Sequence, residues 1–297
     1  MDKEWLTNHF EYYRNYFLGR FFPRRLADIL YTKYMEGAKI NWSTPVDLNE
    51  KINWLKFNSN TTEWTRLADK YRVREYVQSK GLKDILVPLL GVWDKVEEIN
   101  WDSLPDQFVL KTNNGAGSVL IVEDKSKLNI DKEKSKLNQW IKKRFGVLSA
   151  EPHYLKIPPK IIAEDLLHND AEFSTSLVDY KVWCFNGEIF GTWCCFNRQA
   201  FVADTEWHDL EWNFRPEWSI FTDHYKNGGG IVPKPKCYDE LLKIASGLSK
   251  GFPEVRVDLY IVNDKVYFGE MTFTSASGHN NFYSKEALVR MGNMTII

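Results

Sequence analysis

In residues 4–57, large apolar side chains recur every three or four positions, which is the period of an amphipathic α-helix. The first members of this series are aromatic: Phe10, Tyr13, Phe17 and Phe21. Pro23 and Pro45 interrupt the run, because proline lacks the backbone N–H that a helix interior requires. The pattern predicts a helical N-terminal region, which we place at residues 1–64.

The helical period returns at several later places in the chain. It predicts one helix at residues 65–80, for which Gly81 is a favourable C-terminal stop. It predicts further helices at residues 131–145, at residues 238–252 and at the end of the chain.

Short apolar or alternating runs predict strands in the remaining segments. These runs cover residues 84–93, 107–113, 118–124, 160–167, 179–185, 188–196, 255–264 and 265–274. Asn186-Gly187 separates two of them and predicts a β-hairpin with a type I′ turn. Residues 200–236 contain three tryptophans and a run of glycines, and we expect them to be irregular. The mixture of helices and strand pairs predicts an α+β protein of two or three sub-domains.

Composition and charge remove several classes of protein. The net charge of −1 gives no overall attraction to nucleic acid. The N-terminus lacks the continuous apolar segment of a signal peptide, and no apolar run reaches the roughly 18 residues that span a membrane. Three of the four cysteines lie in apolar runs without metal-ligand spacing, so we expect buried thiols, a reducing cytoplasmic compartment and a soluble protein.

Five basic residues interleave with the aromatic residues of the N-terminal region: Arg14, Arg20, Arg24, Arg25 and Lys33. Two interpretations remain open. One is a packed helix pair with a solvated basic face, and the other is peripheral contact with a membrane surface or an anionic polymer.

The last two predicted strands each carry one carboxylate in an apolar run, Asp258 in VRVDLY and Glu270 in FGEMTF. If Asn263-Asp264 is the turn of a hairpin, the two side chains lie close together. Such a pair needs a compensating cation, and hard oxygen ligands suit Mg²⁺ together with phosphate. Arg256 projects from the same strand face as Asp258 and suits phosphate charge. The alternative is that both carboxylates are exposed strand charges.

Lys111 ends an apolar strand and is followed by the loop NNGAGS. Glycines let backbone N–H groups approach phosphate oxygens, and the lysine adds a positive charge. The spacing is neither that of a P-loop nor that of a dinucleotide fingerprint, and an ordinary hairpin turn is an equal alternative.

The order of these motifs resembles the ATP-grasp superfamily. The superfamily resemblance rests on DKYRVR, FVLKTNNGAGS, IIAEDLL, DYK, VRVD and GEMT. A closer resemblance to the TupA-like ATP-grasp group of polysaccharide and teichuronopeptide biosynthesis rests on STPVDLNEKINWLKF, PLLGVWD, DYKVWCFNGE and VRVDLY…FGEMTFT. It implies two α+β sub-domains with antiparallel sheets that enclose the nucleotide. We place them at residues 65–165 and 166–297, after the helical region at 1–64.

The resemblance implies roles for individual residues at the nucleotide. Lys111 and Arg74 contact the phosphates, the glycine loop covers them, residues 164–167 form an adenine hinge, and Glu172 accepts from the ribose hydroxyls. The implied nucleotide-binding residues are Arg74, Lys111, Gly115, Ala116, Gly117, Ser118, Glu164, Asp165, Leu167 and Glu172.

The resemblance also implies the catalytic and metal-binding groups. Lys181 is a second phosphate lysine, Arg256 steadies the transferred phosphoryl group, and Asp258, Glu270 and Thr272 stand at metal-ligand positions. Thr272 departs from the family, in which many members have asparagine there. A second departure is that the region before residue 69 is too short and too helical for the usual Rossmann-like leading domain.

The implied activity is an ATP- and Mg-dependent carboxylate–amine ligase that forms an amide through an acyl phosphate. Its expected substrates are a carboxylate-bearing saccharide, such as a uronic acid of a bacterial capsule, or an amino acid, together with an amine. The alternatives are a glycosyltransferase of the same pathway, although a DxD motif is lacking, a sugar-kinase-like phosphotransferase, and a binding module with a degenerate site. The segment with Trp207, His208, Asp209, Trp212 and Trp218 is either a sugar-stacking surface or an aromatic lid or satellite core. We expect His208 and His224 to be ordinary surface residues and His279 to lie near the metal strand.

Overall fold

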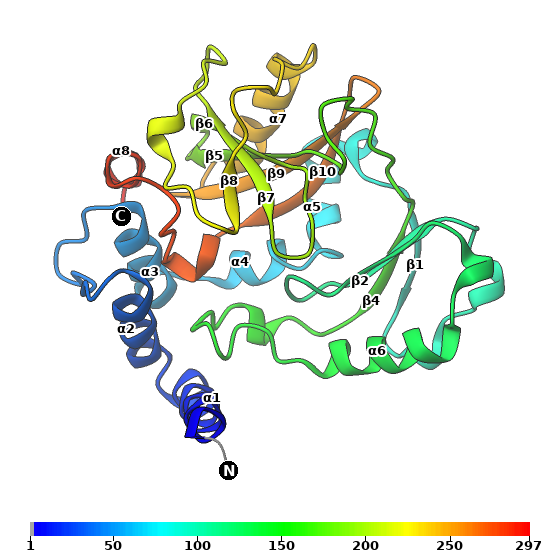
Figure 1. The fold of residues 1–297 in the computed structure, drawn as a ribbon, viewed down its shortest axis with the longest axis horizontal. Coiled ribbons are helices and arrows are strands. Elements are labelled where there is room, and N and C mark those ends of the chain that lie inside the picture. The colour runs from blue at the N-terminus through cyan, green and yellow to red at the C-terminus, as the bar shows by residue number, and fades with distance from the viewer. Residues whose placement is uncertain (1–2) are drawn as a thin grey trace.

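Two β-sheets organise the chain in the computed structural model, which describes residues 3–297, with side chains from residue 9 onward (Figure 1). The small sheet has the order β1-β4-β2-β3, and all of its neighbouring strands are antiparallel. Its strands are β1 (Leu89–Trp93), β2 (Phe108–Thr112), β3 (Val119–Val122) and β4 (Ile161–Glu164).

The large sheet has the order β10-β9-β5-β6-β7-β8 and is antiparallel except for the β7–β8 pair. Its strands are β5 (Asp179–Phe185), β6 (Glu188–Phe196), β7 (Ala203–His208), β8 (Tyr225–Asn227), β9 (Val255–Val262) and β10 (Lys265–Thr272). These two antiparallel sheets and the helices around them confirm the predicted α+β class.

Helices flank the sheets and form most of the N-terminal region. They are α1 (Lys3–Phe21), α2 (Pro23–Tyr34), α3 (Leu48–Asn58), α4 (Thr62–Leu67), α5 (Val73–Ser79), α6 (Ile130–Lys142), α7 (Tyr238–Ser249) and α8 (Lys285–Met294). Short 3-10 turns are η1 (Lys83–Ile85), η2 (Val96–Glu98), η3 (Trp101–Ser103), η4 (Lys125–Lys127), η5 (Tyr154–Lys156), η6 (Pro216–Trp218) and η7 (Ser275–Gly278). No helix in residues 3–297 is long and apolar enough to cross a membrane.

The single helix predicted at residues 65–80 is wrong, because the chain breaks it between α4 and α5. Asp69 lies in the break, and its Oδ1 atom accepts from the backbone N–H groups of Tyr71 and Arg72 at 2.9 and 3.2 Å. A short side chain that satisfies nearby N–H groups favours a turn over a continuous helix.

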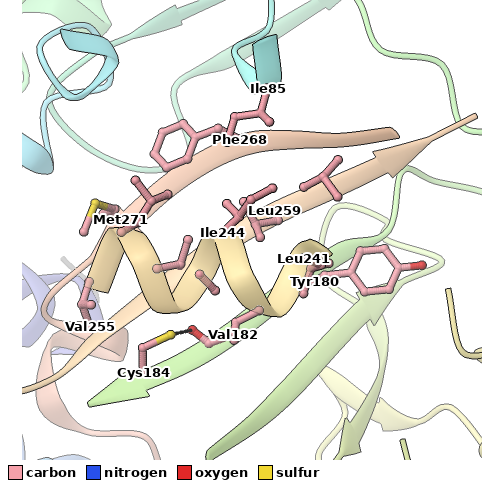
Figure 2. Packing of buried hydrophobic residues seen from close by; sticks show 14 of the residues in the cluster. Ile85, Tyr180, Val182, Cys184, Leu241, Ile244, Val255, Leu259, Phe268 and Met271 are labelled. Carbon is pink, nitrogen blue, oxygen red and sulfur yellow. Dashed lines mark hydrogen bonds between the residues drawn. The ribbon is translucent and has the colours of Figure 1, made fainter. Parts of the chain in front are cut away.

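The largest core lies between α7 and one face of the large sheet. Figure 2 shows Ile244 and Leu241 of α7 packed between Val182 of β5 and Leu259 of β9, all of them buried. Phe268 and Met271 of β10 both belong to this core, although they are three residues apart. Strict alternation places residues three apart on opposite faces of a strand. The alternation of side chains must therefore shift by one residue between Phe268 and Met271.

The opposite face of the large sheet carries a second, aromatic core covered by α3 and α8. Its largest members are Trp183, Trp193, Trp207, Trp218 and Tyr283. The small sheet packs against α6 around Phe108, Leu110 and Leu137, which form a third core.

Both predicted hairpin turns are present. Asn186 and Gly187 have φ values of 49° and 92°, and they join β5 to β6. Asn263 and Asp264 have φ values of 51° and 57° between β9 and β10. Positive φ at both central residues is the type I′ geometry, which matches the twist of the flanking strands.

The expectation that residues 200–236 are irregular is wrong for part of the segment, which supplies β7 and β8. β7 pairs with β6 along Thr192–Phe196, so polar residues such as Asp204 and Glu206 occupy a strand in spite of their low strand propensity. Cys184, Cys194 and Cys195 are buried thiols as expected, and burial raises the pKa of Cys184 to about 12.

Candidate functional site

The carboxylates of β9 and β10 lie on one face of the large sheet, opposite α7. Asp258 and Glu270 are Cα partners, and a bulge shifts the register between Phe268 and Glu270. Gly269 occupies this bulge, where a Cβ atom would lie 2.9 Å from the Asp258 carbonyl oxygen. The extra residue turns Glu270 to the face that carries Asp258, because side chains alternate along a strand.

Two cations surround the buried carboxylate of Asp258. Arg256 donates from Nε to Oδ1 at 2.7 Å and from Nη2 to Oδ2 at 2.8 Å, and Lys181 Nζ donates to Oδ2 at 2.6 Å. Burial alone would lower the pKa of Lys181, but the carboxylates of Asp179 and Asp258 raise it above its ordinary value. Likewise, burial opposes and Asp258 favours the charged form of Arg256, whose pKa is raised. Both cations therefore stay charged inside the protein.

Glu270 is more accessible than Asp258, with 33% of its side chain exposed. Its Oε2 atom accepts from Lys70 Nζ at 2.6 Å, and its Oε1 atom accepts from Thr272 Oγ1 at 3.2 Å. Partial burial would raise the pKa of Glu270, but Lys70, Lys181 and Arg256 hold it well below its usual range. Glu270 thus offers a fully ionised carboxylate at the open side of the cluster.

A chain of buried polar groups ties Arg256 to helix α3. Arg256 Nη1 donates to Ser275 Oγ at 2.9 Å, and Ser275 Oγ donates to Asn280 Oδ1 at 2.8 Å. Asn280 Nδ2 in turn donates to Asn49 Oδ1 at 2.8 Å. The N-terminal helical region therefore contributes directly to the support of the guanidinium.

A second charged cluster lies on the small sheet around Glu164 of β4. Lys111 Nζ lies 2.5 Å from Glu164 Oε2, and Arg74 Nη1 lies 3.1 Å from Oε1. Arg74 also donates from Nη2 to the carbonyl oxygen of Val87 at 2.9 Å. The side chain of Glu164 thus holds together the two cations that the sequence places at the phosphates.

Residues 69–74 connect the two clusters, which the sequence analysis did not foresee. Lys70 reaches Glu270 of the large sheet, and Arg74, one helical turn later, reaches Glu164 of the small sheet. Asp69 Oδ1 accepts from Asn113 Nδ2 at 2.8 Å, which fixes this segment to the loop after β2. Asp69 and Lys70 belong to the motif DKYRVR and Asn113 to the loop NNGAGS, so both motifs contain residues of the connection as well as Arg74 and the glycines.

The glycine loop joins β2 to β3, and its tip is exposed. Gly117 has a φ of 76°, which favours glycine, and Ala116 and Gly117 face solvent while Ser118 is buried. A Cβ atom on Gly115 would lie 2.5 Å from the ring of Phe145, so this glycine permits the loop to pack closely there.

The segment after β4 is tied to the rest of the protein at Asp165 and again at His168, whose Nε2 atom lies 3.1 Å from Gln107 Oε1. Asp165 N donates to the carbonyl oxygen of Pro88 at 3.1 Å, whereas the backbone N–H of Leu167 donates to no group among the described residues. Glu172 is exposed and, within residues 3–297, joins neither charged cluster. A hollow of about 640 Å³ touches this segment at Asp165 and Leu166, but its other walls include Asp106, Glu123 and Asp124. An acidic lining of this kind repels phosphate, so we do not place the phosphates there.

The aromatic segment does not form a sugar-stacking surface. Trp207 and Trp218 are buried in the second core, and Trp212 stacks on His208 with ring centroids 4.2 Å apart. The expectation that His208 is a surface residue is wrong, because it is buried and lies 3.0 Å from Glu206 Oε2. His224 is exposed as expected.

Comparison with known families decides what the fold is. The model of the TupA-like ATPgrasp family matches residues 50–296. The chain belongs to the TupA-like ATP-grasp family. This result confirms the resemblance that the sequence motifs carried, and no curated protein gives a significant match.

Solved structures similar to this TupA-like chain are ATP-grasp ligases of low sequence identity. The D-alanine–D-alanine ligase of Bacillus anthracis with ATP aligns at 15% identity over 72% of this chain and 56% of that chain, with a TM-score of 0.42. The Helicobacter pylori ligase aligns at 14% identity over 84% and 66%, with a TM-score of 0.44. The ligase PsnB with a minimal precursor aligns at 12% identity over 73% and 55%, with a TM-score of 0.41. The chain therefore spans little more than half of the first of these ligases.

The oxygen ligands that the TupA-like chain offers fit a magnesium ion that is bound partly by the protein and partly by substrate phosphates. In residues 3–297, no group of three or more His, Cys, Asp or Glu side chains forms a metal cage. Two carboxylates remain, and Mg²⁺ usually takes one or two carboxylates with waters and substrate phosphates. Glu270 is open to an ion, whereas both oxygens of Asp258 are engaged by Lys181 and Arg256. Thr272 bonds Glu270 and lies 3.3 Å from Arg256 Nη2, which suits a supporting hydroxyl.

Proposed function

We propose that the protein binds Mg-ATP between its two sheets and joins a carboxylate to an amine through an acyl phosphate. The observation that carries this proposal is the array of Lys181, Arg256, Asp258 and Glu270 on one face of the large sheet, which Lys70 joins from the segment between α4 and α5. Three fixed cations around two carboxylates form a site for a metal and for several phosphate oxygens. Phosphoryl transfer depends mainly on positioning and charge neutralisation of this kind.

In this proposal the nucleotide extends from the segment after β4 to the charged array. Residues Glu164–Leu167 flank the adenine, and the backbone N–H of Leu167, which has no partner in the described part of the chain, provides a donor for it. Lys111 and Arg74 then lie beside the phosphates, and the tip Ala116–Gly117 covers them. Glu172 would reach the ribose hydroxyls only if its exposed segment moves inward. The predicted boundaries at residues 64 and 165 remain part of the proposal.

Magnesium, held by Glu270 and Asp258 with Thr272 beside them, would neutralise phosphate charge when it is bound. Asp258 becomes a ligand if the ammonium of Lys181 leaves its Oδ2 atom for a phosphate oxygen. Arg256 stays in place through Ser275 and steadies the transferred group. The supported guanidinium thus acts as a preorganised donor whose position does not depend on the nucleotide.

The proposed reaction has two steps. A substrate carboxylate oxygen attacks the γ-phosphorus of ATP, and ADP leaves with the electron pair of the broken P–O bond. An amine nitrogen then attacks the acyl carbon, phosphate leaves, and the nitrogen loses a proton. Closure of the glycine loop would exclude water, which otherwise hydrolyses the acyl phosphate.

We further propose that the carboxylate belongs to a uronic acid of a bacterial surface polysaccharide or capsule, or to an amino acid joined to it. The support is the family, whose TupA-like group is associated with such polymers, and the location would be cytoplasmic. Of the aromatic residues on which this sugar was expected to stack, Trp207, His208 and Trp218 are buried, and Trp212 is stacked on His208. The saccharide must therefore be recognised by other surfaces.

The decisive experiment incubates the protein with Mg-ATP and a panel of uronic acids and amines. We expect ADP and phosphate in equal amounts only when both substrates are present, with a product mass equal to their sum less one water. A stable phosphorylated sugar would instead indicate a phosphotransferase. Binding of UDP-sugars without ATP binding would indicate a glycosyltransferase. Absence of ATP binding would indicate a degenerate site, and each of these three results contradicts the ligase proposal.

A further inference from the structure

Helix α1 carries an exposed aromatic stripe that no other described part of the chain covers. Phe10, Tyr13, Phe17 and Phe21 are 69%, 67%, 54% and 63% exposed. Their spacing of three and four residues places them on one side of the helix, over about a third of its circumference. Contiguous exposed apolar surface of this kind marks an interaction site on a folded protein.

The C-terminal end of α1 contacts the protein through residues outside the stripe. Leu18 is buried, and a Cβ atom on Gly19 would lie 1.7 Å from the carbonyl oxygen of Val147. Tyr12, also outside the stripe, is 50% exposed. Figure 1 shows α1 extending away from both sheets at the end of the molecule that carries α2. The stripe therefore lies on a helix that projects from the rest of the molecule.

Arginines border the stripe and continue from it into α2. Arg14 and Arg20 lie on its two sides along α1, and Phe22, Arg24 and Arg25 follow at the start of α2. Arg20, Arg24 and Arg25 are exposed. Among the described side chains, those of residues 9–297, no carboxylate forms an ion pair with any of these four arginines, and Glu11 of α1 pairs with Lys33 of α2 instead. Their positive charge is thus available to an external anionic partner.

We propose that this surface, which we name the α1–α2 ridge, docks on an anionic lipid bilayer. The ridge comprises Phe10, Tyr13, Arg14, Phe17, Arg20, Phe21, Phe22, Arg24 and Arg25. A flat bilayer can contact the projecting helix along its whole length, with the phenylalanines at the acyl boundary and the guanidiniums among lipid phosphates. A hollow of about 380 Å³ at the start of α2 is lined by Phe22, Pro23, Arg24, Arg25 and Asp28, and it does not include the aromatic stripe of α1. The charge of the arginines selects anionic over zwitterionic lipid.

The proposal stands on residues remote from the charged array and holds whether or not the proposed ligase activity is correct. Its test is co-sedimentation of the purified protein with vesicles of phosphatidylcholine, alone or mixed in equal parts with phosphatidylglycerol. We expect sedimentation with the mixed vesicles, little with the neutral ones, and release in high salt. Each arginine near an anionic surface contributes about fivefold to partition, as about 1 kcal/mol per charge implies.

Two variants and two matched controls decide the outcome. Arg20→Gln with Arg25→Gln should weaken partition by about twenty- to thirtyfold, and Phe17→Ser with Phe21→Ser by at least about tenfold. The control for charge is Lys243→Gln with Lys285→Gln, which removes two exposed lysines elsewhere, and the control for exposed aromatic area is Phe201→Ser. Unchanged far-ultraviolet circular dichroism and melting temperature establish that the variants fold.

Three results would overturn the inference. The first is that wild type and ridge variants bind the mixed vesicles equally well, or that wild type binds neutral and mixed vesicles equally well. The second is a dimer in sedimentation velocity that the Phe17→Ser and Phe21→Ser variant converts to monomer without vesicle binding, which would assign the ridge to a second copy of the chain. The third is ridge-dependent binding to a soluble polyuronic acid with no binding to vesicles.

Discussion

The Nζ atom of Lys181 on β5 lies 2.6 Å from the Oδ2 atom of Asp258 on β9, and both side chains are buried. The two residues are also Cα partners in the ladder between the strands, so the sheet itself sets their distance. Arg256 holds the same carboxylate through two further bonds. Loss of the Asp258 charge therefore removes the nearest carboxylate of both buried cations, which keep only Asp179 at 3.3 Å from Lys181 and Glu270 at 3.8 Å from Arg256. Glu270, a third exposed, can lose its charge at a lower cost.

Asp258→Asn and Glu270→Gln should separate stability from activity. We expect Asp258→Asn to lower the free energy of unfolding by about 3–5 kcal/mol, because a partner of buried charges is removed. Glu270→Gln should change it by about 1 kcal/mol or less, yet both should reduce ATP-dependent phosphate release at least about a hundredfold. Urea denaturation and the phosphate assay measure the two effects. The control is Asp264→Asn in the exposed turn of the same hairpin, and full turnover in Glu270→Gln would exclude Glu270 from the metal site.

Gly269→Ala tests the bulge that aligns the two carboxylates. The added Cβ atom would lie 2.9 Å from the Asp258 carbonyl oxygen and 3.0 Å from the ring of Tyr260. We expect a loss of about 1–3 kcal/mol in stability, with reduced magnesium-dependent ATP binding measured by calorimetry. Gly247→Ala in α7 is the matched control, because its Cβ atom meets nothing within 4 Å. It should stabilise the protein by about 0.5–1 kcal/mol. Similar behaviour of the two variants would argue against a strained bulge.

Trp207→Ala tests whether the tryptophans after β6 serve the core or the ligand. Trp207 is fully buried among Phe190, Trp193 and Trp218. Its truncation should cost about 3–5 kcal/mol in denaturant unfolding. Phe201→Ala, at a side chain that is largely exposed, should stay within about 0.5 kcal/mol of wild type. A Trp207 variant of wild-type stability with weakened sugar binding would restore the stacking interpretation.

His153 should make the protein less stable as the pH falls. Burial, with the charges of Lys56 and Lys156, lowers the pKa of His153 to about 3, and neither ring nitrogen has a partner in the described chain. A depressed histidine pKa means that the unfolded chain takes up the proton first. Its contribution to stability is complete above pH 6.5 and is lost as the pH falls toward 3, at up to about 1.4 kcal/mol per unit.

The measurement compares His153→Phe with wild type by urea denaturation at several pH values. The difference between the two proteins cancels the carboxylates that titrate in both. We expect wild type to lose stability between pH 6.5 and 5 faster than the variant does. Burial lowers the pKa of His279 to about 4, so His279 should account for the pH dependence of stability that remains in His153→Phe. If a His279 variant keeps the same pH dependence, another group is responsible for it. Parallel curves for wild type and His153→Phe would contradict the prediction.

Much of the secondary structure followed from local pattern, and much of the charged array did not. The turns at Asn186-Gly187 and Asn263-Asp264 were predictable because their backbone geometry depends on few residues. The break at Asp69 was not predictable from local sequence. The Asp69 carboxylate accepts from the turn and also from Asn113, and only the fold brings Asn113 to it. By sequence alone, Lys70 resembles an ordinary exposed lysine. It gains a role only because the tertiary structure brings its ammonium group to Glu270 of the large sheet. The burial of Trp207 depends on β7 pairing with β6, a long-range contact.

The sequence by itself determined the strand carrying Asp258, the strand carrying Glu270, the turn between them and the family to which their motifs belong. It did not determine that the two carboxylates share a face. From the Asn263-Asp264 turn, an unbroken ladder would pair Asp258 with Gly269 and direct Glu270 into the core beneath α7. The bulge at Gly269 adds one residue, reverses the alternation, and puts Met271 in the core and Glu270 beside Asp258. Only the tertiary structure decides this, because the bulge is stable where Phe268 and Met271 both join the core that α7 covers, while Lys70, Lys181 and Arg256 compensate the carboxylates on the other face.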